Sequence, residues 1–274
     1  MTRATEVDEP AHSFDDSAAY ERFMGRWSSA AGSKFLDWLS APLGARWLDV
    51  GCGTGVFTEL IFDRCAPAAI SGVDPAATQI EHSKRQPFAQ FAHFRVAPAE
   101  LLPFPSAAFD VVSSALVFNF IADKPKALFE MRRVACAGGI IAAYIWDFSA
   151  ELSPSWPLRV AMRKFGIDVP DVPGTRVSGL DAIRLLFEQA GLQNVTTTTI
   201  DVSLSYRDFS DFWLAQMPSY SPTTKIIAEM ADSERARLID IVRTGLHAST
   251  DGAVEYSARA NAIRGMCPLD TGSR

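Results

Sequence analysis

The first half of the chain alternates short apolar runs with stretches in which apolar residues recur every three or four positions. The apolar runs predict buried strands, which we expect over residues 46–50, 69–73, 91–96, 109–118 and 140–146. The other stretches predict amphipathic helices, which we expect over residues 28–39, 58–64 and 76–84 and from Asp123 to Gly138. Strands and helices that alternate in this way predict an α/β fold, with a mostly parallel sheet covered by helices on both faces.

The pattern changes after residue 147. Residues 148–176 are rich in proline and aromatic residues and show no clear period, whereas Ser178 has the spacing of a capping box for a helix that ends at Gly191. Polar and apolar residues alternate in two later segments, which predicts an antiparallel strand pair over residues 200–206 and 254–262. The segments between these strands predict a small helical cap, with helices over residues 208–216 and 223–246.

One domain accommodates all of these elements. We expect it to span residues 41–274, with cap insertions at about 148–178 and 207–250, preceded by an N-terminal lid segment over residues 1–40. The length of 274 residues and the hydrophobic content of 48% are typical of a globular protein with one large core and a small cap.

Charge and cysteine usage narrow the expected partners and location. The net charge of −6 disfavours nucleic acid as a partner, because surfaces that neutralise phosphates are usually basic. The first twenty residues are polar and do not resemble a signal peptide, and the longest apolar run is too short to span a membrane. The four cysteines have no paired spacing, and neither they nor the four histidines have metal-site spacing. We therefore expect a cytoplasmic protein without a membrane span or a metal; its oligomeric state stays open.

A glycine-rich turn follows the first predicted strand, with the sequence Gly51-Cys-Gly-Thr-Gly55. Glycine is required where a chain turns sharply or where a ligand approaches bare backbone, and the start of the following helix offers free N–H groups to an anion. A dinucleotide-binding turn would place its third glycine where this chain has Val56, and the signature of a P-loop is missing. The turn alone is weak evidence for a ligand, because tight structural turns also use glycine.

Asp74 supplies the second part of the pattern, since it ends the second predicted strand nineteen residues after Gly55. A carboxylate at about this distance from a glycine turn binds ribose hydroxyls in nucleotide-binding folds. The alternative is a structural Asp74-Pro75 turn that only ends the strand. Together, the glycine turn and the acidic residue favour a ligand.

The motif from Leu48 to Gly55 resembles the first motif of class I S-adenosylmethionine-dependent methyltransferases, which have a Rossmann-like fold. Within this class the chain resembles the ubiquinone/menaquinone-biosynthesis-like group (type 11). The resemblance extends to Ala-Glu-x-Leu-Pro-Phe-Pro at residues 99–105, to Phe-Asp-Val-Val at 109–112 and to the helix at 130–134. It covers residues 20–147 well and the remainder in outline.

The resemblance implies a set of residues that bind S-adenosylmethionine: Tyr20, Arg26, Asp49, Gly51, Gly53, Gly55, Asp74, Pro75, Ala99 and Glu100. In this arrangement the glycines would pack against the methionine part of the cofactor, Asp49 would lie beneath its amino group and Asp74 would bind the ribose. Ala99 and Glu100 would border the adenine. The chain departs from the group at Pro98, where an acidic residue is common, so backbone groups would have to contact the adenine amino group.

The aromatic cluster between Tyr20 and Trp27 has two interpretations. It either packs on the domain as an ordinary amphipathic helix, or it folds over the cofactor as a lid, with Tyr20 or Arg26 at the methionine carboxylate. The resemblance favours the lid.

The residues that would act on the acceptor are less defined. Many members of the group carry a histidine pair where this chain has Asn119 and Phe120, so a catalytic role of those histidines does not transfer. Tyr144, Asp147 and Asn119 are the candidates for a general base, and the amino-methylation motif of enzymes that modify DNA bases or glutamine is missing.

We expect a small, largely apolar acceptor, because the cap is rich in aromatic side chains, namely Phe148, Trp156, Phe165, Phe209, Phe212, Trp213 and Tyr220, together with Met217. For many of these residues, packing of the cap onto the sheet is the simpler explanation. Two other functions stay open: a catalytically silent protein that binds S-adenosylmethionine or S-adenosylhomocysteine, and, disfavoured by Val56, a nucleotide-dependent oxidoreductase.

Overall fold

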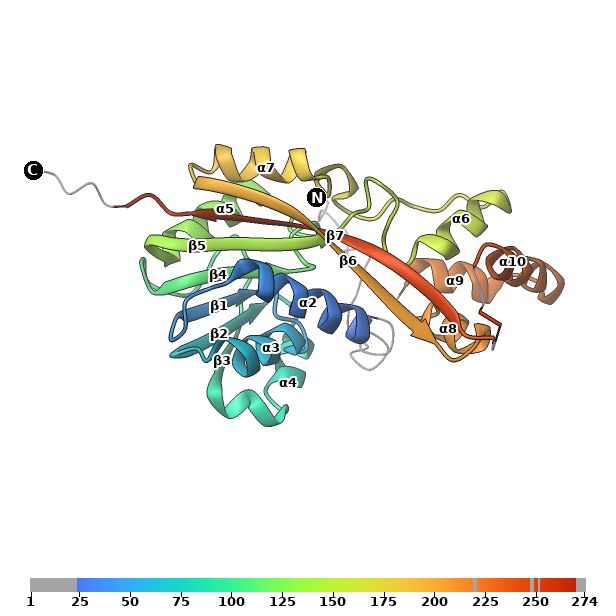
Figure 1. Cartoon of the computed structure of the whole chain (residues 1–274), viewed down its shortest axis with the longest axis horizontal. Coiled ribbons are helices and arrows are strands. Elements are labelled where there is room, and N and C mark those ends of the chain that lie inside the picture. The colour runs from blue at the N-terminus through green and yellow to red at the C-terminus, as the bar shows by residue number, and fades with distance from the viewer. Residues whose placement is uncertain (1–23, 219–220, 247–248, 251, 270–274) are drawn as a thin grey trace, which may run out of the picture.

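A seven-stranded mixed sheet organises the molecule, with strand order β3-β2-β1-β4-β5-β7-β6 (Figure 1). The computed structural model describes residues 24–218, 221–246, 249–250 and 252–269. The strands are β1 (Arg46–Val50), β2 (Ala69–Asp74), β3 (Ala92–Val96), β4 (Phe109–Ala115), β5 (Ala135–Trp146), β6 (Gln193–Tyr206) and β7 (Val254–Met266). The first five pair in parallel, and β7 lies antiparallel between β5 and β6. The prediction of a mostly parallel sheet closed by an antiparallel pair is confirmed.

Helices cover both faces of this sheet, and further helices pack against the far ends of β6 and β7. They are α2 (Arg26–Leu39), α3 (Val56–Cys65), α4 (Ala77–Ser83), α5 (Lys124–Val134), α6 (Trp156–Lys164), α7 (Leu180–Gln189), α8 (Phe209–Ala215), α9 (Pro222–Glu229) and α10 (Asp232–Thr244). Short 3₁₀ helices cover Pro87–Phe91 and Thr175–Val177. Among the described residues, no helix combines the length and apolar character that a membrane-spanning segment needs.

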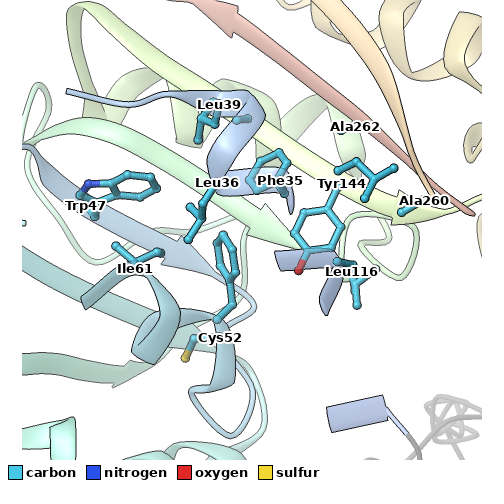
Figure 2. Close-up of a cluster of buried hydrophobic side chains, with 14 of the residues drawn as sticks. Phe35, Leu36, Leu39, Trp47, Cys52, Ile61, Leu116, Tyr144, Ala260 and Ala262 are labelled. Atoms are coloured by element: carbon cyan, nitrogen blue, oxygen red, sulfur yellow. The ribbon is translucent and has the colours of Figure 1, made fainter. Parts of the chain in front are cut away.

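Two apolar clusters separate the helices by face. Successive residues of β1 point to opposite faces, so Trp47 joins the cluster under α2, α3 and α4, and Leu48 joins the cluster under α5 and α7. In the first cluster Phe35 of α2 packs beside Tyr144 of β5, with ring centroids 4.7 Å apart (Figure 2). Because these side chains are fully buried, α2 belongs to the main core. It covers the face of the sheet on which Phe35 contacts Tyr144.

The predicted cap forms a third cluster, built from α6, α8, α9, α10 and the far ends of β6 and β7. Figure 1 shows β6 and β7 projecting beyond the parallel strands as a long ribbon, with the cap helices gathered at its far end. Phe212 of α8 is its fully buried aromatic residue, and it contacts the rings of Tyr206 and Tyr256 from the two strands.

The predicted end of the helix that begins after Asp123 is wrong, because strand pairing overrides the local signal. The Asp123 side chain accepts a hydrogen bond from Lys126 N as expected, but α5 ends at Val134, and the chain enters β5 at once. Gly138 therefore lies inside a strand, with φ at +71°, where the β4–β5 pairing register shifts. The glycine accommodates a bulge rather than a helix end.

The expected capping box at Ser178 is also wrong. Gly179 occupies the N-cap position of α7 without a side-chain bond, and the Ser178 hydroxyl instead donates to Thr175 O and accepts from Ser149 N. The segment predicted as one helix over residues 223–246 is two helices, α9 and α10, which are interrupted at Met230 and Ala231. Helix α6 was not predicted, since its prolines and aromatic residues hide the helical period.

Candidate cofactor site

The glycine turn lies at the carboxyl edge of the sheet, where the parallel strands β1, β2 and β4 end. Its first two amides, Gly51 N and Cys52 N, donate to Val73 O of β2 at 2.7 and 2.9 Å. The turn therefore folds across the end of the neighbouring strand. In open α/β sheets this edge is the usual position of a ligand.

The three glycines of the turn have positive φ angles but different surroundings. A Cβ on Gly51 would lie 2.4 Å from Val117 Cγ1, and one on Gly55 would lie 2.8 Å from the Phe88 ring. A Cβ on Gly53 would meet nothing within 4 Å, although φ is +52° there. Gly51 and Gly55 thus permit close packing, whereas the backbone at Gly53 faces open space that a ligand can approach.

Asp49 lies beneath the turn and is fully buried. Its Oδ2 accepts a hydrogen bond from Thr58 Oγ1 at 2.7 Å, and its Oδ1 has no hydrogen-bond partner in the described part of the chain. Burial raises the pKa of this carboxyl from 3.8 to about 7; the Thr58 hydrogen bond opposes the shift, and the nearby charge of Asp74 adds to it. A buried carboxylate oxygen without a partner is costly, and a bound cation or N–H donor would relieve that cost.

Asp74 lies at the end of β2, 9% exposed, and faces the same turn. Its Oδ2 accepts from Gly53 N at 3.0 Å and its Oδ1 from Ala76 N at 2.9 Å. Burial raises the pKa of Asp74, and the two backbone N–H groups oppose the shift. The hydrogen bond from Ala76 N shows that Asp74 and Pro75 form the structural turn given above as the alternative. Each carboxylate oxygen still has room for a second donor, so this turn is compatible with ribose binding.

The segment after β3 borders Asp74 through its backbone, because Ala97 N donates to Asp74 O at 3.1 Å. Ala99 is buried in the cluster under α5 and α7. Glu100 accepts a hydrogen bond from Asp123 N at 3.3 Å, which connects it to the start of α5. The structure thus brings this segment close to the end of β2, and the assignment of Ala99 and Glu100 to an adenine site stays a prediction.

Arg26 lies at the start of α2 and is held by β6. Its Nη2 donates to Ser205 O at 2.7 Å, and its guanidinium lies 5.2 Å from the centre of the Tyr206 ring. The neighbouring Trp27 donates from its indole nitrogen to Tyr206 Oη at 3.1 Å. These contacts do not bring Arg26 to Asp49 or to the glycine turn. Tyr20 lies outside the described residues.

The three candidate bases occupy different environments. Tyr144 packs between Phe35 and Phe57 in the apolar cluster, with centroid distances of 4.7 and 5.7 Å. Asp147 Oδ1 accepts from Ser149 Oγ and Ala150 N at 2.8 and 2.9 Å. Each of these side chains therefore has a structural role where it lies.

Asn119, the third candidate, follows β4 and is 2% exposed. Its Nδ2 donates to Pro173 O at 3.1 Å, and a Cβ on Gly174 would lie 2.3 Å from Asn119 O. The loop after α6 is therefore packed directly against the segment that follows β4. This contact could not be predicted from the sequence, because the loop has no regular hydrophobic period. Thr58, the partner of Asp49, was also missed, although its place in the first turn of the helix after the glycines is a usable signal.

Most of the aromatic residues proposed for the acceptor pocket contribute to the core of the cap. Phe212 is fully buried in this core. Four partly buried residues pack against the same cluster, namely Phe165, Phe209, Trp213 and Met217. Phe148 packs against the cluster under α2, and Arg163 covers the Trp156 ring at 4.8 Å. Tyr220 lies outside the described residues. Packing of the cap thus explains many of these side chains.

Comparison with known proteins shows where this architecture recurs. A family model described as a methyltransferase domain matches residues 48–143. The chain is 33% identical over 130 residues to malonyl-[acyl-carrier protein] O-methyltransferase from Serratia marcescens, covering 45% of this chain and 49% of that protein. It is 37% identical over 111 residues to a ubiquinone/menaquinone biosynthesis C-methyltransferase from Geotalea uraniireducens, covering 39% of this chain and 46% of that protein.

A solved structure extends the likeness of the fold beyond the matched family segment. Phosphoethanolamine N-methyltransferase 2 from Haemonchus contortus, in complex with S-adenosyl-L-methionine, superposes with a TM-score of 0.58 at 16% identity, over 97% of this chain and 62% of that chain. At this identity the likeness concerns the fold alone. The chain spans about half the length of these two curated relatives.

Proposed function

Because the chain carries a class I S-adenosylmethionine-dependent methyltransferase domain, we propose that it is an active enzyme that transfers a methyl group to a small, largely apolar acceptor. The observation that carries the cofactor assignment is Asp49, a fully buried carboxylate whose Oδ1 has no partner among the described residues. The ammonium group of a bound amino-acid moiety would complete its hydrogen bonding.

The other residues of the edge suit the same cofactor. S-adenosylmethionine supplies an activated sulfonium methyl when it is bound. The open backbone at Gly53 leaves room for the methionine part, and Asp74 has acceptor capacity left for the ribose hydroxyls. Because the methyl is already activated, this chain has to hold donor and acceptor in line and exclude water, which contributes about 7–11 kcal/mol in well-oriented systems.

A general base is a secondary requirement in this proposal, since it contributes roughly 10²–10⁴-fold and only if the acceptor loses a proton. Asn119 and Asp147 lie at the ends of β4 and β5, and we propose them as groups that shape the acceptor site through the loops they hold. Tyr144 remains a proposed base.

A small apolar acceptor is supported by the aromatic cap and by the acidic net charge of −6, which disfavours a polyanionic acceptor. The names of the two curated relatives describe methyl transfer to oxygen in one case and to carbon in the other. They support methyl transfer as the reaction class and leave the acceptor atom open.

Calorimetry with S-adenosylhomocysteine, S-adenosylmethionine and NAD tests the cofactor assignment. We expect both adenosyl compounds to bind and NAD not to bind. Asp63→Ala changes an exposed carboxylate of α3 and is the matched control for the variants of Asp49 and Asp74. It should leave the affinity for S-adenosylhomocysteine unchanged. Tight NAD binding without S-adenosylhomocysteine binding would make the protein a nucleotide-dependent oxidoreductase.

Turnover with radiolabelled methyl donor and a panel of small apolar acceptors tests the activity. Label transferred to a panel member supports the proposal. Cofactor binding without transfer to any acceptor, including those of a total cell extract, would favour the catalytically silent protein.

A further inference from the structure

Arg159 of α6 is a buried arginine that forms no ion pair within the described residues. The residue is 8% exposed and belongs to the inner side of a helix that otherwise buries Leu158, Ala161 and Met162. Its Nη2 donates to Pro170 O at 2.5 Å, and this is the one hydrogen bond of its side chain to the described residues. Burial lowers the pKa of Arg159, and the neighbouring Arg163 lowers it further, while Asp171 opposes the shift.

The carboxylates near Arg159 do not neutralise it. Asp171 is exposed and forms no ion pair with Arg159 within 4.0 Å among the described residues. Glu151 pairs with Arg163 at 3.2 Å instead. A guanidinium has five N–H donors, so four remain after the bond to Pro170 O. The free Arg159 nitrogens are not among the fully buried unpaired polar atoms of the described residues, so these donors are accessible to an anion from solvent.

The loop that contacts Arg159 also contacts the edge of the sheet. Pro170 O accepts from Arg159, and Pro173 O, three residues later, accepts from Asn119 Nδ2. Three Cα–Cα steps span at most about 11 Å. Asn119 follows Val117, whose side chain lies directly beside Gly51 of the glycine turn. This loop therefore connects Arg159 to the segment that follows β4 beside the cofactor edge.

We propose that Arg159 forms an anion subsite of the acceptor pocket and binds a carboxylate at the end of the acceptor that lies away from the methyl-accepting atom. This inference rests on the proposed methyltransferase function. A carboxylate suits the site better than a phosphate dianion, because one free guanidinium supplies one charge and a planar fork that matches a carboxylate bidentately. The acceptor class is then a small apolar molecule with a single carboxylate.

The test uses the full chain loaded with S-adenosylhomocysteine and a panel of matched probes. Octanoate, hexanoate and 3-phenylpropanoate are compared with their amides and with octyl phosphate, by calorimetry and by thermal shift. We expect at least one carboxylate to bind about tenfold or more tightly than its amide, and octyl phosphate to bind no better than octanoate. Equal binding of every acid and its amide, or no binding of either, would overturn the subsite, and stronger binding of octyl phosphate would replace the carboxylate with a phosphate.

Variants separate an anion subsite from a structural arginine. Arg159→Gln should lose about 10- to 100-fold in carboxylate affinity and keep its affinity for the amide. Arg159→Lys keeps the charge and should retain a preference for the acid over the amide. Arg163→Gln, on the same helix but paired with Glu151, is the matched control and should change affinity less than twofold. A lower Tm of Arg159→Gln with unchanged carboxylate affinity, or loss of the preference in Arg159→Lys as well, would show that Arg159 only anchors the loop.

S-adenosylhomocysteine affinity is measured for every variant in the same experiment. It should stay unchanged in Arg159→Gln, because Arg159 makes no contact with Asp49, Asp74 or the glycine turn. If the unmodified protein fails to bind S-adenosylhomocysteine, the proposed function is wrong. If S-adenosylhomocysteine binds and no carboxylate does, the subsite alone is wrong.

Discussion

The buried carboxyl of Asp49 should make the stability of the free protein depend on pH. Its pKa is about 7 in the folded protein against 3.8 for an ordinary aspartate, because burial disfavours the charged form. Between these two values the folded state binds the proton more tightly than the unfolded state does. The stabilisation is therefore fully present below about pH 4 and is lost as the pH rises through about 7.

The magnitude follows from the pKa difference. The separation from 3.8 to about 7 is roughly 3 units, and one unit corresponds to about 1.4 kcal/mol. Ionised Asp49 should thus destabilise the free protein by about 4 kcal/mol at pH 8. Asp49→Asn keeps the size of the side chain and removes the charge. The variant should match the original protein near pH 4 and be more stable by up to about 4 kcal/mol at pH 8.

Urea unfolding between pH 4.5 and 8, followed by tryptophan fluorescence, measures the difference in the free energy of unfolding between the two proteins. Asp37→Asn is the matched control, because Asp37 is an exposed carboxylate paired with Arg64, and it should change stability by less than about 1 kcal/mol. A difference between Asp49→Asn and the original protein that stays constant from pH 5 to 8 would refute the reasoning.

The same ionisation should control cofactor affinity in the opposite direction. A bound ammonium group favours ionised Asp49, so S-adenosylhomocysteine affinity should rise with pH below about 7, by at most about tenfold per pH unit. Calorimetry of Asp49→Asn should show weaker binding without this dependence. A pH dependence that persists in the variant would assign the proton to another group.

Two further predictions concern the edge of the sheet, and a third concerns residues 20–27. Asp74→Ala should weaken S-adenosylhomocysteine binding by about 1.5–3 kcal/mol in calorimetry, and unchanged affinity would remove Asp74 from the site. Gly51→Ala should lower the free energy of unfolding by at least about 2 kcal/mol, because its Cβ would collide with Val117. Gly53→Ala should lower it by about 1 kcal/mol and weaken S-adenosylhomocysteine binding about tenfold. Equal losses of stability in the two variants would contradict this distinction. Hydrogen exchange across residues 20–27 should slow when S-adenosylhomocysteine is added, as expected of a lid, and unchanged protection would count against that role.

Strong local signals made the parallel half of the fold predictable. The strand at residues 46–50 matches β1 at both ends, because a break at Pro42 and Gly44 precedes it, apolar Trp47, Leu48 and Val50 form it and glycines follow it. The glycine turn and Asp74 were also identified from the sequence, since both lie within the span of one βαβ unit. The structure adds what spacing cannot give, namely that Gly53 faces open space while Gly51 is packed against Val117.

The second half was less predictable, because its boundaries depend on partners that are distant in sequence. Strand β6 begins at Gln193 rather than at residue 200, and its early polar residues are ordered by pairing with β7. Arg159 carries no local signal either, since an arginine in a proline- and aromatic-rich segment looks like a solvated side chain. Its burial results from packing of α6 against α10 and the ends of the long strands.

Unfavourable features of the free protein gather at the carboxyl edge of the sheet. Two buried carboxyls, Asp49 and Asp74, lie close enough for the charge of one to raise the pKa of the other. Beside them Leu116 has a φ of +60° at the end of β4, a conformation that is strained for a leucine. Packing of the core would favour an apolar residue at position 49 and an extended backbone at position 116. Such unfavourable features persist where the surrounding structure holds them in place and where a bound ligand offsets their free-energy cost. They cluster at functional sites. The two buried carboxyls and the strained Leu116 lie together beside the glycine turn, and this combination is the physical reason to propose the cofactor site there.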